Sequence, residues 1–152
     1  MPRFTATKHL PHPVEDVFAA SSDFANAADN VEAITKTEIL TDGPVGVGTR
    51  FTETRVIFKR EATETMEVSV FDPPNRYVLL ADSCGTKYET TLDFEPRDGG
   101  TQLTMTFDAR PYTIMGKIMG FIFRPMMKSM LKMVEKDFDD LSASLTARQR
   151  ST

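Results

Sequence analysis

The spacing of apolar residues changes along the chain and predicts where strands and helices lie. Apolar and polar residues alternate with a period of two over 3–10 and again from 33 to 109, which indicates β-strands. The expected strands are 3–10, 33–41, 48–58, 61–71, 76–83, 86–95 and 101–109. Turn sequences rich in Gly, Pro and Asp separate the later strands, as in DGPVGVG, DPPN and RDGG. These connections are too short for crossover helices, so neighbouring strands should pair antiparallel.

Two short helices are expected between the first two strands. Pro11 and Pro13 end the first strand, and the following PVEDVFAASS has proline at the start of a helix. Asp23 can cap a second helix over DFANAADN.

The C-terminal segment changes to a helical period. From 127 onwards its apolar residues recur every three or four positions and form one stripe, which consists of Met127, Leu131, Val134, Phe138, Leu141 and Leu145. We expect a helix over roughly 112–147 that Pro125 bends or interrupts. An antiparallel sheet with one apolar face needs a cover, and this helix is the only element long enough. The pattern predicts an α+β fold, with a six- to seven-stranded antiparallel sheet around a long C-terminal helix.

Composition fits one domain and excludes some partners. The chain has 152 residues, of which 40% are hydrophobic and 26% charged, as expected for a single core. We assign 1–147 to this domain and expect 148–152 to be a disordered tail. The net charge of -4 argues against nucleic-acid binding. With no export signal, no long apolar run and the single Cys84, the sequence predicts a cytoplasmic protein.

Charged residues occur on the apolar face of the hairpin FTETRVIFKREATETMEV, residues 51–68. A turn centred on Lys59 and Arg60 would pair Phe51 with Val68, Glu53 with Met66, Arg55 with Glu64, and Ile57 with Ala62. Glu53, Arg55 and Glu64 would then face the C-terminal helix. Buried charges persist where they satisfy one another, so the three should lie within hydrogen-bonding reach.

This charged trio has a structural and a functional interpretation. It can be an ion-pair network that sets the strand register. It can equally belong to a cavity wall, where the second carboxyl has a raised pKa and donates a hydrogen bond or proton to a ligand. A third possibility is that Arg55 binds a ligand carboxylate with its planar fork. The candidates for acid–base catalysis are Glu53 and Glu64.

The chain resembles the START-like helix-grip (SRPBCC) superfamily, in particular its polyketide cyclase/dehydrase-like branch. The resemblance rests on the order of elements, the PHPVEDVFAASSDF opening, the GVGTRF and FDPPNRY turns and the PRDGGTQLTMTF hairpin, and it covers roughly 3–146. It implies a curved sheet wrapped around the long helix, with a cavity between them. Members of this kind include lipid and hormone carriers and ring-forming cyclases.

Three functions are compatible with the resemblance and the residues. The favoured one is binding of a small hydrophobic or amphipathic molecule, lipid-like or polyketide-like. The expected ligand-binding residues are Glu53, Arg55, Glu64, Met66, Tyr88, Met105, Phe107, Met119 and Met130. The alternatives are a cyclase or dehydratase limited to proton transfer, and a lipid chaperone that docks to membranes. Met residues suit an adaptable cavity wall, but a stripe of Met at helical spacing is more often core filler.

The two histidines, the cysteine and the basic C-terminal segment are weaker candidates for function. His9 and His12 flank Pro11 and are expected at the surface, so we predict no metal site and no cofactor. Cys84 precedes Gly85 and is expected in a turn or wall. The segment 114–133 mixes Lys and Arg with large apolar residues, as interfacial helices do. Because the same residues should cover the sheet, the sequence disfavours membrane contact; the oligomeric state is open.

Overall fold

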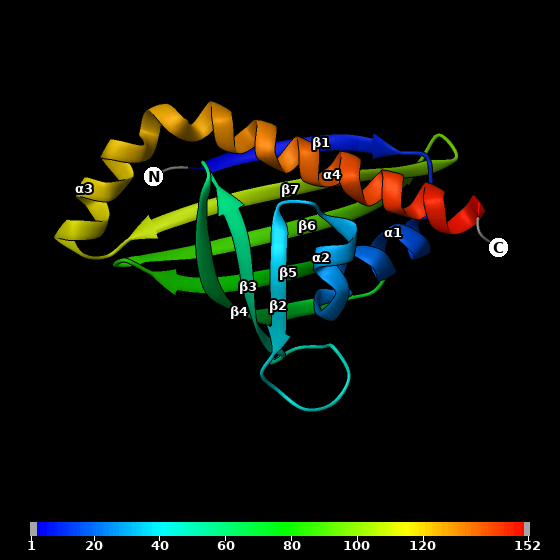
Figure 1. The fold of residues 1–152 in the computed structure, drawn as a ribbon, viewed down its shortest axis with the longest axis horizontal. Coiled ribbons are helices and arrows are strands. Elements are labelled where there is room, and N and C mark those ends of the chain that lie inside the picture. The colour runs from blue at the N-terminus through cyan, green and yellow to red at the C-terminus, as the bar shows by residue number, and fades with distance from the viewer. Residues whose placement is uncertain (1–2, 151–152) are drawn as a thin grey trace.

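The alternating segments form one antiparallel sheet of seven strands in the order β1-β7-β6-β5-β4-β3-β2 (Figure 1). The computed structural model describes residues 3–150. The strands are β1 Arg3–Leu10, β2 Ile34–Ile39, β3 Arg50–Ile57, β4 Arg60–Asp72, β5 Arg76–Ser83, β6 Thr86–Arg97 and β7 Gly100–Pro111. The predicted fold class and strand order along the chain are confirmed.

The helices occupy the predicted places. The first strand is followed by α1 Val14–Ser21, the 3-10 turn η1 Phe24–Asn26 and α2 Ala27–Asn30. The C-terminal segment forms α3 Ile114–Phe123, the 3-10 turn η2 Arg124–Met126 and α4 Met127–Arg150. The predicted interruption at Pro125 is confirmed, because it lies in η2 between the two helices. The helix α4 continues past the expected boundary at 147, and residues 151–152 of the expected tail lie outside the described residues.

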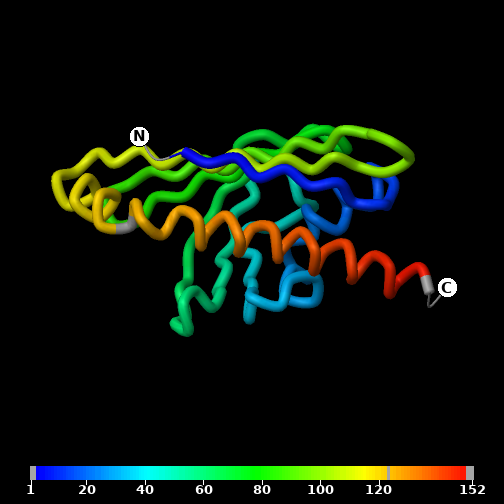
Figure 2. Tube along the Cα trace, turned by 90° about the horizontal axis from the view of Figure 1, so that it is seen from above, coloured from blue at the N-terminus to red at the C-terminus, as the bar shows by residue number. Residues whose placement is uncertain are grey.

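The sheet bends strongly along its width. Strands β2 and β3 run steeply across the direction of β1 and β7 in Figure 1, and they turn out of the layer of the other strands in Figure 2. The register of β4 against β5 shifts between Val68 and Val70, and such irregularities increase local bending and twist. The curved sheet leaves a concave side along which α4 runs.

The turn of the β3–β4 hairpin differs from the sequence expectation. It consists of Phe58 and Lys59, both with positive φ, rather than being centred on Lys59 and Arg60. The observed register pairs Phe51 with Met66, Glu53 with Glu64, Arg55 with Ala62, and Ile57 with Arg60. The predicted pairs were therefore wrong by two residues. A shift of two keeps every side chain on its predicted face, because the side-chain period of a strand is also two.

The tightly packed core lies towards the C-terminal half of α4. There Phe138, Leu141 and Leu145 are buried against α1 and the sheet. Leu131, nearer the start of α4, is only partly buried, although it belongs to the predicted stripe. Packing is therefore dense at one end of the concave side and looser at the other, where the candidate site lies.

The prediction of a surface position was wrong for His12. Its side chain is 2% exposed, and its Nε2 atom lies 3.2 Å from both the Ser142 carbonyl and the Thr146 hydroxyl. The turn between Pro11 and Pro13 directs it under α4, where the imidazole joins the core. His9 is exposed, as is Cys84 in the β5–β6 turn. Residues 3–150 contain no group of His, Cys, Asp and Glu that could hold a metal ion.

Candidate functional site

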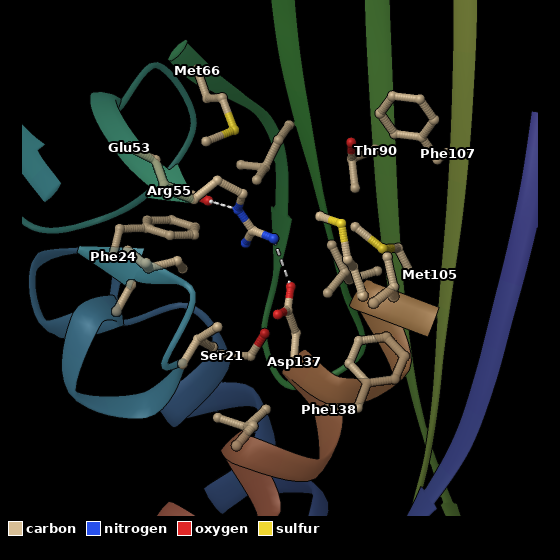
Figure 3. A pocket seen from close by; sticks show the side chains of 18 of the residues that line it. Ser21, Phe24, Glu53, Arg55, Met66, Thr90, Met105, Phe107, Asp137 and Phe138 are labelled. Carbon is tan, nitrogen blue, oxygen red and sulfur yellow. Dashed lines mark hydrogen bonds and ion pairs between the residues drawn. The ribbon is translucent and has the colours of Figure 1, made fainter. Parts of the chain in front are cut away.

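A cavity of about 340 Å³ lies between the concave side of the sheet, α2 and α4. Its wall is largely apolar and includes side chains from β1, the α1–α2 region, strands β2 to β7 and α4. Figure 3 shows these side chains converging on a central space, with Arg55 inside it. The charged side chains of the wall are Glu53, Arg55, Glu64 and Asp137.

Arg55 lies between two carboxylates that come from different elements. Its Nε atom donates to Glu53 Oε1 at 2.8 Å, and its Nη1 atom donates to Asp137 Oδ2 at 2.8 Å (Figure 3). Arg55 is 21% exposed, and each acid is 16% exposed. This arrangement ties β3 to α4 through one guanidinium.

The local sequence explains how the three groups meet. Glu53 and Arg55 are two residues apart on β3, so both point to the concave side. Asp137 lies three residues after Val134 and four before Leu141, which places it on the apolar stripe of α4. Sequence reasoning missed Asp137 because it considered the apolar members of that stripe. A charged residue at stripe spacing was the signal that could have identified it.

Glu64 does not join the ion pairs as expected. Among the described residues, Arg55 forms ion pairs with Glu53 and Asp137 but not with Glu64. The expectation that all three members of the trio bond to one another is therefore wrong for Glu64. The difference comes from the tertiary structure, because Asp137 on the facing helix α4 forms the second ion pair with the guanidinium. Glu64 lies directly opposite Glu53 in the ladder and remains exposed at the cavity wall.

Burial and the excess of carboxyls over cations shift the pKa values of Arg55, Asp137 and Glu64. Burial lowers the pKa of Arg55, but the charges of Glu53 and Asp137 outweigh it, so the pKa is raised. Burial raises the pKa of Asp137, which the Arg55 charge opposes without reversing. Although Glu64 is exposed, its position at the cavity wall partly removes water from the carboxyl and raises its pKa; the Glu53 charge raises the pKa further, and Arg55 opposes both. Arg55 is therefore paired with two of the three carboxyls, and Asp137 and Glu64, whose pKa values are raised, bind protons more readily than usual.

Replacing Glu64 by Gln should raise the free energy of unfolding by roughly 0.2–1 kcal/mol at neutral pH, because it removes a like charge opposite Glu53. A carboxyl whose pKa is raised by folding stabilises the protein below its unfolded pKa and loses that contribution as the pH rises through the folded value. The gain should therefore disappear below the ordinary pKa of 4.5. Urea denaturation at both pH values measures it.

The matched control for this change is Glu61→Gln, on the opposite face of β4, where stability should hardly change. A loss of stability in Glu64→Gln at neutral pH would show instead that the fold stabilises the ionised form of Glu64.

Most of the expected apolar and aromatic site residues line the cavity. These are Met66, Tyr88, Met105, Phe107 and Met130. Met119 does not line it, because it belongs to α3, which lies beyond the end of the sheet (Figure 1). Met133 lines the cavity and was not singled out from the sequence, although it follows Met130 at helical spacing.

Three of the aromatic side chains of the wall form a stacked row. The Tyr88 ring stacks on Phe107 with centroids 5.5 Å apart, and Phe107 stacks on Phe4 at 5.1 Å. Burial raises the pKa of the Tyr88 phenol. On another part of the wall, the Tyr77 hydroxyl lies 2.7 Å from Ser21 Oγ and joins β5 to α1. The cavity therefore offers flat apolar surfaces as well as its charged group.

Comparisons with known proteins agree with the fold. The model of a family described as polyketide cyclase / dehydrase and lipid transport matches residues 1–147. No curated protein matches the chain in sequence.

Solved structures share the whole architecture at low identity. A protein from Thermus thermophilus is 21% identical with a TM-score of 0.78, covering 97% of this chain and 99% of its own. A conserved protein from Geobacillus kaustophilus is 19% identical with a TM-score of 0.71, covering 96% of both chains. A protein of unknown function from Staphylococcus aureus is 12% identical with a TM-score of 0.74, covering 98% of this chain and 96% of its own. At these identities the likeness shows the helix-grip fold alone.

Proposed function

The chain belongs to the polyketide cyclase/dehydrase and lipid transport family, and from this premise we propose that it binds a small, uncharged amphipathic molecule in its cavity. Family and fold indicate ligand binding in general terms. The observation that supports the finer proposal is the placement of Glu53, Arg55 and Asp137 in an otherwise apolar wall. A mostly apolar cavity with a few convergent polar groups is typical of small-molecule sites.

The charges of the wall disfavour an anionic ligand. Two of the five N–H donors of Arg55 already bind carboxylates, and the charges of these two acids offset the charge of the guanidinium, so Arg55 offers little net attraction to a ligand carboxylate. An anionic ligand would also meet the charges of Glu53, Asp137 and Glu64. Carboxylate oxygens accept hydrogen bonds, and a protonated Glu64 can donate one. A hydroxyl, phenol or carbonyl group is therefore the polar end that fits.

The size of the cavity supports a ligand with one ring system or one acyl chain. Its volume of about 340 Å³ is near the lower end of the roughly 300–1,000 Å³ that is typical of small-molecule sites. The stacked Tyr88 and Phe107 rings offer a flat apolar contact for an aromatic ligand.

Two matched naphthalene compounds test the proposed ligand class. The neutral dye N-phenyl-1-naphthylamine should bind with increased fluorescence, and 1-naphthol should displace it more effectively than 1-naphthoate at neutral pH. The reason is that the three carboxyls of the wall repel the anion. Failure of the dye to bind, or stronger displacement by naphthoate, would contradict the proposal. Native mass spectrometry of freshly purified protein should in addition identify a co-purified molecule.

Filling the cavity should weaken ligand binding without disturbing the fold. In Met105→Trp the indole occupies space beside Met130 and Phe107, so the affinity for the dye should fall by at least about tenfold. The control is Thr106→Trp, the next residue of β7, which points to the opposite face of the sheet. Equal affinities in the two variants would show that the dye binds elsewhere.

A second candidate function is proton-transfer catalysis, favoured by the facing pair Glu53 and Glu64. The Glu53 charge is one cause of the raised Glu64 pKa, and a carboxyl with a raised pKa can serve as a general acid. A pH–rate profile on a polyketide-like substrate tests this function. Activity that persists in Glu64→Gln would exclude Glu64 as the general acid.

A further inference from the structure

The helix α3 presents a large apolar face to solvent. Ile114, Met115, Ile118, Phe121 and Ile122 are 50 to 79% exposed. Positions 114, 118, 121 and 122 have the spacing of one helical face. Large contiguous apolar surfaces are uncommon on monomeric soluble proteins and mark interaction sites.

This face is exposed because α3 does not cover the sheet. Figure 1 shows α3 beyond one end of the strands, while α4 runs along the sheet. The contact of α3 with the sheet is narrow: Thr113 caps the helix by accepting from the Gly116 N–H at 3.0 Å, and Gly116 packs against Gly85. The sequence-based argument against membrane contact, which required this segment to cover the sheet, therefore does not hold for α3.

The charge of the segment that carries this face is entirely positive. No Asp or Glu occurs between Asp108 and Glu135, although the whole chain has a net charge of -4. The same interval contains the exposed residues Arg110, Lys117, Arg124, Lys128 and Lys132. Arg110 lies 3.8 Å from Asp108, and within residues 3–150 the other four form no ion pair. Cations and large apolar side chains are thus combined on one exposed segment.

We propose that α3 docks onto the surface of an anionic phospholipid bilayer. Its apolar face enters the boundary between headgroups and acyl chains, and the cations of 110–132 contact the lipid phosphates. A symmetric dimer through the same face would bring two positively charged segments together, which charge complementarity disfavours. The described helices include none that is long and apolar enough to cross a membrane.

The docking surface adjoins the cavity wall along the chain. Docking to a bilayer does not require that the cavity bind a ligand. The helix α4 begins at Met127, directly after η2, and Met130 and Met133 on its first turns line the cavity. Docking by α3 would therefore hold this part of the wall close to the bilayer, where an amphipathic molecule could be exchanged.

Flotation with two kinds of vesicle tests the proposal. The protein should bind vesicles of phosphatidylcholine mixed with phosphatidylglycerol and should bind pure phosphatidylcholine much more weakly. Added salt should weaken binding, because it screens exposed charges. Absence of binding to the mixed vesicles, or equal binding to both kinds, overturns the proposal.

Two double variants separate the contribution of the apolar residues to vesicle binding from the contribution of the cations. Ile114→Ser with Phe121→Ser should weaken binding to the mixed vesicles by at least about tenfold. Lys117→Glu with Lys128→Glu should weaken it by at least about 30-fold, since each cation near an anionic surface contributes about one factor of five.

The controls change the same chemistry at other exposed places. Val47→Ser removes an exposed apolar side chain from the loop before β3, and Lys36→Glu with Arg97→Glu makes the same change in net charge. These controls should retain full binding, and circular dichroism should show all variants folded. If both double variants bind the mixed vesicles as well as the unchanged protein does, the proposal is overturned. So it is by a dimer, seen in sedimentation, that the two double variants dissociate while vesicles remain unbound.

Discussion

Replacing Arg55 by Met should lower the free energy of unfolding by about 3 kcal/mol at neutral pH, because it leaves two largely buried carboxylates without their cation. Glu53 and Asp137 are each 16% exposed, so bulk water can solvate them only in part once the guanidinium is removed. The loss should shrink as the pH falls, since protonation removes the uncompensated charges. Urea denaturation over a range of pH measures both effects.

The double variant Arg55→Met with Asp137→Asn should recover part of this loss, because it removes one of the two stranded charges. The matched control is Arg76→Met, which breaks an exposed ion pair with Asp93 and should cost no more than about 1 kcal/mol. If Arg55→Met costs as little as this control, water in the cavity compensates the acids. The polar group would then contribute to ligand binding far more than to stability.

Replacing Phe18 by Ala should cost about 3–5 kcal/mol, because it leaves a cavity at the centre of an aromatic cluster. The Phe18 ring is buried and contacts three others, with centroid distances of 5.0 Å to Phe94, 5.4 Å to Phe71 and 5.8 Å to Tyr77. These contacts hold α1 against the sheet. Denaturation with urea or heat measures the loss.

Phe121→Ala is the control for this change, because its ring is 76% exposed on α3 and its removal should alter stability by no more than about 0.5 kcal/mol. Phe18 does not line the ligand cavity, so the folded Phe18→Ala variant should keep its affinity for the naphthylamine dye. A loss of less than about 1 kcal/mol would mean that the neighbouring rings collapse into the space.

The strands and helices, and the sides on which their residues lie, follow from short-range periodicity. Alternation placed Glu53, Arg55 and Glu64 on the concave face even though the predicted turn was wrong, since an error of two residues preserves the face of a strand. Likewise, the stripe from Leu131 to Leu145 and the break at Pro125 are local properties of the chain.

Contacts between distant segments depended on the tertiary structure. Asp137, rather than Glu64, became a partner of Arg55, because the position of α4 across the curved sheet determines which carboxylate the guanidinium reaches. The same placement buried His12 and left α3 uncovered, with its apolar face in solvent. Periodicity shows which way a side chain points along its own element. It does not show what lies opposite, because this depends on how far the sheet bends and where the long helix crosses it.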